Sequence, residues 1–154
     1  KQRDARGYEL LAMVGLEGFE DKKPSELSGG MRQRASLCRA LAHRPEVLIL
    51  DEPFGALDAF TREDLWQIMH ELRHAEAFTC LLITHDLRES VFLADRVVVL
   101  SGRPAKTQYV LDVPFGRDRK LDDLFTTEAT EMLRDLRHQI QVAQGRTAEA
   151  ETSS

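Results

Sequence analysis

The stretch that most constrains the fold of this chain is an apolar run, Val47 to Leu50, followed directly by Asp51 and Glu52. Four consecutive apolar residues bounded by polar ones predict a short strand that is buried on both faces. Ligands of open α/β sheets collect at the carboxyl ends of the strands. Asp51 can therefore hold Mg²⁺, directly or through water, while Glu52 can orient and deprotonate an attacking water. The alternative interpretation is a buried strand followed by an acidic turn.

Upstream of this strand, Ser28-Gly29-Gly30 leads into a segment with helical periodicity that begins at Met31. The serine hydroxyl, the close approach that glycine permits and the positive end of a helix dipole together suit a phosphate group. The alternative is a serine-capped helix with a flexible lead-in. The spacing places Arg32 and Arg39 on the outer face of this helix. The residues expected to face the core are Met31, Ala35, Cys38 and Ala42.

Downstream, residues from Phe78 to Thr84 are rich in β-branched, aromatic and aliphatic types and predict a second buried strand. His85 follows its end, as the two carboxylates follow theirs. A histidine there can donate a hydrogen bond to a phosphate and hold a water in place. The alternative is that His85 begins a turn before a helix from Leu87 to Leu93, with Asp86 as its cap.

The order and spacing of these features resemble the ATP-binding subunit of an ABC transporter, over roughly residues 8–112. The resemblance identifies four motifs: the signature motif at Leu27 to Gln33, the Walker B strand at Leu48 to Glu52, the D-loop at Ala56 to Asp58, and the switch histidine at His85. No Gly-Lys dipeptide occurs, so the chain contains no Walker A loop. We expect the part of the family's domain that carries this loop to be missing from the chain.

The resemblance implies that ATP and Mg²⁺ are the cofactors, with Asp51 as the metal ligand and Glu52 and His85 as the catalytic residues. Family members act as dimers in which the signature loop of one subunit closes on the ATP held by the other. The residues implied in nucleotide binding or at the dimer seam are Ser28, Gly29, Gly30, Gln33 and Asp58.

For the fold, the resemblance implies the C-terminal part of a P-loop NTPase: an α/β fold with a mostly parallel sheet, flanking helices and the end of a helical subdomain. Four regions follow from it. They are the end of the helical subdomain with the signature motif and its helix (residues 1–42), the ATPase core (43–113), a C-terminal crossing and helix (114–144), and a disordered tail (145–154).

The sequence pattern predicts three further helices and one pair of strands. A helix from about Asp4 to Val14, with Tyr8, Leu11, Ala12 and Val14 on one face, should end at Gly15. A helix from about Thr61 to Ala75 should bury Leu65, Ile68, Met69 and Leu72, with Trp66 and His70 off that stripe. Two antiparallel strands, Arg96 to Leu100 and Gln108 to Val113, should precede a helix from about Thr127 to Ala143.

Composition excludes some classes of partner. The net charge is −5 and the basic residues are scattered, so an electrostatic footprint for nucleic acid is absent. There is no apolar run of 18 or more residues, and we expect a soluble chain. Cys38 and Cys80 are interpreted as small core residues of a reducing compartment rather than as a disulfide.

The resemblance implies an ATPase subunit that energises an importer of a small solute. Asp51 to Asp58 and Phe92 to Leu100 are similar to the nitrate, sulfonate and taurine group. The implied partners are a second copy of the subunit, an integral membrane permease and, indirectly, a solute-binding protein, at the cytoplasmic face of the membrane. Two alternatives stay open: a non-transport ABC-type ATPase of DNA repair or translation, and a truncated non-catalytic interaction subunit. The chain alone is expected to be inactive.

Overall fold

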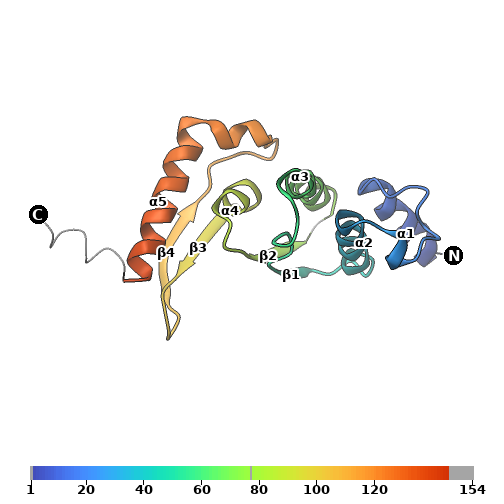
Figure 1. Cartoon of the computed structure of the whole chain (residues 1–154), viewed down its shortest axis with the longest axis horizontal. Helices are drawn as coiled ribbons and strands as arrows, with labels where there is room; N and C mark the ends of the chain where they lie inside the picture. Colours follow the sequence, from blue (N-terminus) through green and yellow to red (C-terminus); the bar gives the residue numbers. More distant parts are fainter. Residues whose placement is uncertain (1, 77, 146–154) are drawn as a thin grey trace, which may run out of the picture. The chain divides into compact units, whose positions relative to one another are not determined.

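The structure, a computed structural model, describes residues 2–76 and 78–145 (Figure 1). It divides into two compact units, residues 1–84 and residues 85–154. The tail expected to be disordered lies, apart from Gly145, outside the described residues.

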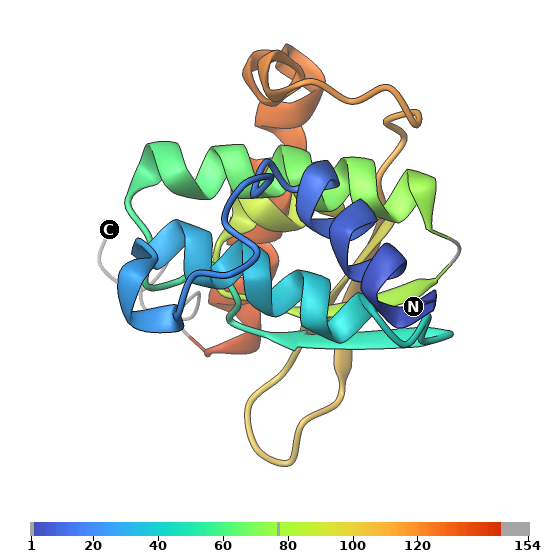
Figure 2. The same ribbon diagram turned by 90° about the vertical axis from the view of Figure 1, so that its right-hand side faces the viewer.

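The first unit is an α/β arrangement built on one pair of parallel strands. Its elements are α1 (Gln2–Met13), η1 (Pro24–Glu26), α2 (Gly29–Leu41), β1 (Val47–Asp51), α3 (Ala59–Ala75) and β2 (Thr79–Ile83). Val47 pairs with Thr79 and Asp51 with Ile83, so both strands end at the same edge. Figure 2 shows the helices of this unit on one side of the strand pair. The predicted fold class, with a parallel sheet and flanking helices, is confirmed for this unit.

The expectation that the two strands are buried on both faces is wrong for this chain. Leu48 is 7% exposed, whereas its neighbour Ile49 is 63% exposed. Val47, Leu81 and Ile83 are exposed as well. The physical reason is that the helices cover one face of β1 and β2, so side chains that alternate along each strand alternate in burial. The exposed apolar residues Val47, Ile49, Leu81 and Ile83 are called the open face below.

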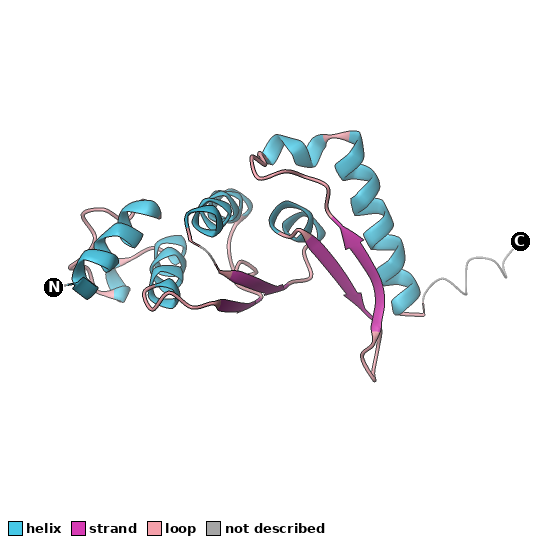
Figure 3. Ribbon diagram, turned by 180° about the vertical axis from the view of Figure 1, so that it is seen from behind, coloured by secondary structure: helices cyan, strands magenta, loops and turns pink. Residues whose placement is uncertain are grey.

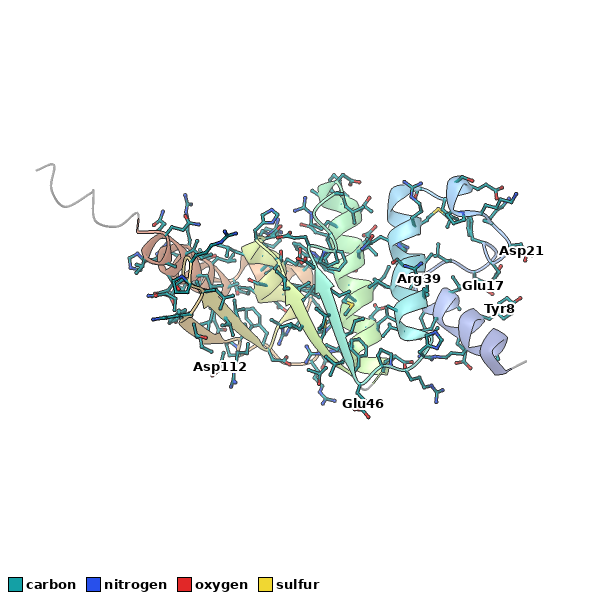
Figure 4. All side chains as sticks on the ribbon, turned by 90° about the horizontal axis from the view of Figure 1, so that it is seen from below. Tyr8, Glu17, Asp21, Arg39, Glu46 and Asp112 are labelled. Carbon is teal, nitrogen blue, oxygen red and sulfur yellow. The ribbon has the colours of Figure 1, made fainter. Side chains whose placement is uncertain are left out.

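The helices of the first unit begin and end close to the expected residues, but their buried faces differ from the predicted stripes. In α1, Leu10 and Val14 are buried, whereas Tyr8 is exposed and lies on the outer side of the helix (Figure 4). The predicted αL end is confirmed, because Gly15 has φ 68°. The buried face of α1 is therefore centred on Leu10.

In α2, the buried residues are Leu37, Cys38 and Leu41. Cys38 was predicted correctly, but Met31 and Ala35 are half-buried and Ala42 is exposed. In α3, Trp66 and His70 are buried beside Leu65, Met69 and Leu72, and the prediction that they lie off the stripe is wrong. A helix that packs on more than one neighbour buries a wider arc than a single row of i, i+3 and i+4 positions.

The second unit contains α4 (Leu87–Leu93), β3 (Arg96–Leu100), β4 (Thr107–Asp112), η2 (Leu121–Phe125) and α5 (Thr127–Ala143). The strands β3 and β4 are antiparallel, as predicted, and Figure 3 shows α5 running alongside them. The short helix η2 was not predicted. The core residues are Val91, Phe92, Leu93, Val99, Val113, Leu124, Ala129, Met132 and Leu136.

Arg119 holds the second unit together in a way that the sequence did not reveal. Its side chain is 3% exposed. The guanidinium donates to the carbonyl oxygens of Phe92 (3.1 Å) and Ala94 (2.6 Å) at the end of α4, and to the carboxylate of Asp95 (3.1 Å). A cation at this place satisfies carbonyl groups that the end of a helix leaves without intrahelical partners.

Both cysteines are free thiols: Cys38 is buried and Cys80 is half-buried. Among the described helices, none has both the length and the apolar character needed to cross a membrane.

Candidate functional site

The glycine-rich segment before α2 forms a capped helix start. Ser28 is the N-cap, and its hydroxyl accepts a hydrogen bond from the backbone N–H of Met31 at 3.2 Å. The helix begins at Gly29, two residues before the expected start. Gly29 and Gly30 thus contribute the first N–H groups of the helix, which have no intrahelical acceptor and can bind an anion. Gln33 lies one turn further on and is half-buried.

Gly30 lies against the start of α3. A Cβ atom at Gly30 would lie 2.6 Å from Cγ2 of Thr61, so the position has no room for a side chain. Thr61 in turn is held by Asp58, the N-cap of α3, which accepts from its N–H at 3.0 Å and its hydroxyl at 2.7 Å. These hydrogen bonds lower the pKa of the Asp58 carboxyl. The structure therefore brings the Ser-Gly-Gly segment and the Ala56 to Asp58 segment together.

Asp51 and Glu52 occupy the carboxyl end of β1, as predicted. Asp51 is the last residue of the strand, and the N–H of Glu52 donates to the carbonyl oxygen of Ile83 at 2.9 Å. Glu52 has φ 46°, in the left-handed region that residues other than glycine seldom adopt. Such a conformation costs of order 1–3 kcal/mol and persists only where the surroundings hold it. Both carboxylates are exposed at the edge where ligands of parallel sheets bind.

His85 is the first residue of the second unit, whereas the other predicted site residues all belong to the first. It is exposed and directly precedes Asp86, the N-cap of α4. The Asp86 cap that belongs to the alternative interpretation is present, because the Asp86 carboxylate accepts from the N–H groups of Arg88 (2.9 Å) and Glu89 (3.3 Å). The cap therefore fixes the backbone of the residue that follows His85.

Arg34 is a supporting residue whose contacts the sequence did not indicate. Its guanidinium donates to the carbonyl oxygen of Val14 at 3.2 Å and lies 3.9 Å from the carboxylate of Asp64. It therefore links the end of α1 and the surface of α3 to α2. A Cβ atom at Gly15 would lie 3.4 Å from the Arg34 guanidinium, so the two residues are close in the structure.

The residues at the carboxyl end of β1 fit the way in which proteins hold Mg²⁺. The described residues contain no group of three or more His, Cys, Asp or Glu side chains that could enclose a metal on their own. Mg²⁺ is usually held by one or two carboxylates, several waters and the phosphates of a substrate. An exposed Asp51 at the end of a strand suits that mode, with Asp51 as the ligand.

Comparison with known proteins shows what this arrangement is similar to. The family model "ABC transporter" matches residues 2–55. A dimeric bacterial ABC transporter cassette, MJ0796, superposes with a TM-score of 0.60 at 33% identity, over 75% of this chain and 49% of that one. The chain therefore resembles part of an ABC transporter cassette, in sequence over residues 2–55 and in fold over 75% of its length.

Three curated relatives show which ABC transporter proteins the chain resembles in sequence. The bicarbonate transport ATP-binding protein CmpD of Synechocystis sp. is 49% identical over 135 residues, which are 87% of this chain and 48% of that protein. The nitrate import ATP-binding protein NrtD of Synechococcus elongatus is 52% identical over 111 residues, 71% of this chain and 40% of that protein. The taurine import ATP-binding protein TauB of Pseudomonas syringae is 47% identical over 116 residues, 75% of this chain and 44% of that protein.

The chain spans less than half of the length of these relatives. The resemblance to ATP-binding subunits of the nitrate, sulfonate and taurine import group is confirmed, and bicarbonate transport proteins belong among the relatives too.

Proposed function

We propose that the protein containing this chain binds and hydrolyses ATP in order to energise an importer of a small solute. The observation that carries the proposal is the pair Asp51 and Glu52 at the carboxyl end of β1, in a chain 46–52% identical to ATP-binding proteins of importers. Nitrate, sulfonates and taurine are the proposed solute class, to which the comparison with CmpD adds bicarbonate.

In this proposal Glu52 is the general base and Asp51 the metal ligand. Bound Mg²⁺ would neutralise negative charge on the phosphates. Glu52 accepts a proton from the attacking water, and its backbone hydrogen bond to Ile83 fixes the start of the side chain relative to the sheet edge. His85 donates a hydrogen bond to the terminal phosphate and orients the water.

Ser28, Gly29, Gly30 and Gln33 act on the nucleotide of a second, identical subunit. The capped start of α2 directs N–H groups and the positive end of the helix dipole outward. Asp58 is proposed to lie at the seam between the two subunits. Its hydrogen bond to Thr61, whose Cγ2 lies against Gly30, supports this role. The further partners are an integral membrane permease and, through it, a solute-binding protein, which puts the subunit at the cytoplasmic face of the membrane.

Uptake by cells that lack the gene tests the proposal. Nitrate, taurine, alkanesulfonate and bicarbonate uptake are each measured in the deletion strain and after complementation. We expect the uptake of one of them to fall, to return with the wild-type gene, and to stay low with the Glu52→Gln variant. The matched control is Glu71→Gln, since Glu71 is an exposed carboxylate on α3 away from the strand end, and it should restore uptake. Unchanged uptake of all these solutes in the deletion strain would remove the assignment.

A further inference from the structure

Two histidines on α3 lie side by side away from the residues of the proposed nucleotide site. His70 and His74 are four residues apart, so they occupy the same face of the helix. Their Nε2 atoms lie 3.2 Å apart, and their rings are nearly perpendicular, with centroids 4.4 Å apart. His70 is 8% exposed, whereas His74 is exposed to solvent.

We propose that His70 and His74 form a binding site for a divalent transition-metal ion, such as Ni²⁺, Cu²⁺ or Zn²⁺, with both Nε2 atoms as ligands. Imidazole nitrogens bind such ions at about 2.0–2.1 Å. Two nitrogens held 3.2 Å apart then subtend an angle of about 100° at the metal, near the tetrahedral value. The separation of the nitrogens is therefore already that of a chelate.

Burial of one member prepares the pair for binding. His70 lies one helical turn beyond Trp66, which is 1% exposed, so its ring belongs to the packed face of α3. A ring held by packing loses little further freedom when a metal binds. His74 brings its ring from the solvent side and gives the ion an entry path. Paired histidines at i and i+4 of a helix are a known arrangement for metal binding, because both rings reach the same point.

The coordination shell would be completed by water. Within the part of the chain that the structure describes, no group of three or more His, Cys, Asp or Glu side chains surrounds a common point. The site is thus a two-residue chelate, and in its metal-free state one Nε2 donates a hydrogen bond to the other. It is independent of the proposed ATPase activity, because neither histidine lies in the segments assigned to nucleotide binding.

Titration of the purified, tag-free 154-residue chain with Ni²⁺ by isothermal calorimetry tests the proposal. We expect one ion per chain. His74→Ala should lower the association constant by roughly tenfold or more, since loss of even an outer-shell partner of a metal ligand costs about 10–100-fold. His138→Ala, an exposed histidine on α5, is the matched control and should leave the constant unchanged.

His74→Gln serves as a second variant, because it keeps a hydrogen-bonding group beside His70 but lacks an imidazole, and circular dichroism checks the fold of each variant. The constants for Co²⁺, Ni²⁺ and Cu²⁺ should rise in that order, as nitrogen ligands dictate, and Mg²⁺ should not compete. Equal Ni²⁺ binding in the wild type, His74→Ala and His74→Gln, or an absence of binding in the wild type, would overturn the proposal.

Discussion

At the residue scale, the Cys38 thiol shows how packing sets chemical reactivity. Burial raises its pKa to about 11, so the thiol is protonated at neutral pH. Because the thiolate is the reactive form, we expect Cys38 to react slowly with a thiol reagent in the native chain and rapidly after unfolding. The native rate should rise steeply only as the pH approaches 11. An aromatic disulfide serves as the reagent, and the absorbance of the aromatic thiolate that it releases gives the rate at each pH. Rapid labelling of Cys38 at pH 7 in the folded chain would contradict the prediction.

The residues that the sequence could predict are those whose role depends on near neighbours in the chain. Gly15 at a helix end and the Ser28 and Asp86 caps are examples, because a cap bonds within its own first turn. The contacts of Arg34 join residues far apart in the sequence, and the burial of Trp66 and His70 depends on what packs against α3. No local pattern encodes contacts of that kind. The catalytic roles of Glu52 and His85 stay predictions.

At the element scale, buried and exposed side chains alternate along β1. Leu48 faces the helices and Ile49 belongs to the open face. We expect Leu48→Ala to lower the free energy of unfolding of the chain by about 2–5 kcal/mol, since it removes buried methyl groups and leaves a cavity. Ile49→Ala, its matched control, should change that free energy by no more than about 0.5 kcal/mol. Urea unfolding followed by circular dichroism measures both, and equal losses would contradict a strand covered on one face.

The loop that follows β4 gives a second prediction at this scale. Arg119→Ala would leave the carbonyl groups of Phe92 and Ala94 and the Asp95 carboxylate without their donor. We expect a loss of roughly 2 kcal/mol or more in the free energy of unfolding of the second unit, since these are hydrogen bonds to a buried charge. Arg137→Ala, at an exposed position of α5, is the control. Hydrogen exchange of the α4 amides reports the effect, and unchanged protection would show that Arg119 is dispensable.

The bounds of most elements could be predicted from periodicity and capping, and those of α4, β3 and α5 agree with the structure. The short helix η2 could not, because a single 3₁₀ turn has no period to detect. The open face of β1 and β2 was predicted to be buried for a related reason. An apolar run indicates that a strand can be buried on both faces. It does not indicate which segments pack against those faces.

At the scale of the whole molecule, we expect the 154-residue chain not to hydrolyse ATP on its own. Phosphoryl transfer depends on positioning the β- and γ-phosphates, which in P-loop ATPases falls to a backbone cradle and a lysine. The sequence has no Gly-Lys dipeptide to build that cradle. Release of phosphate from ATP and Mg²⁺ by the purified chain should therefore stay at background. Magnesium-dependent turnover that Glu52→Gln abolishes would show that another phosphate cradle exists.

The most direct test of the central claim is ATP turnover by the protein that contains this chain, compared between the wild type and Glu52→Gln. The amide keeps the shape of the side chain but cannot accept the proton, so hydrolysis should fall by roughly 10²–10⁴-fold while ATP still binds. ATP that is bound and not hydrolysed should hold two subunits together, and size-exclusion chromatography with ATP should show a dimer. Turnover at the wild-type rate, with only monomer in the presence of ATP, would contradict the assignment of Glu52 as the general base.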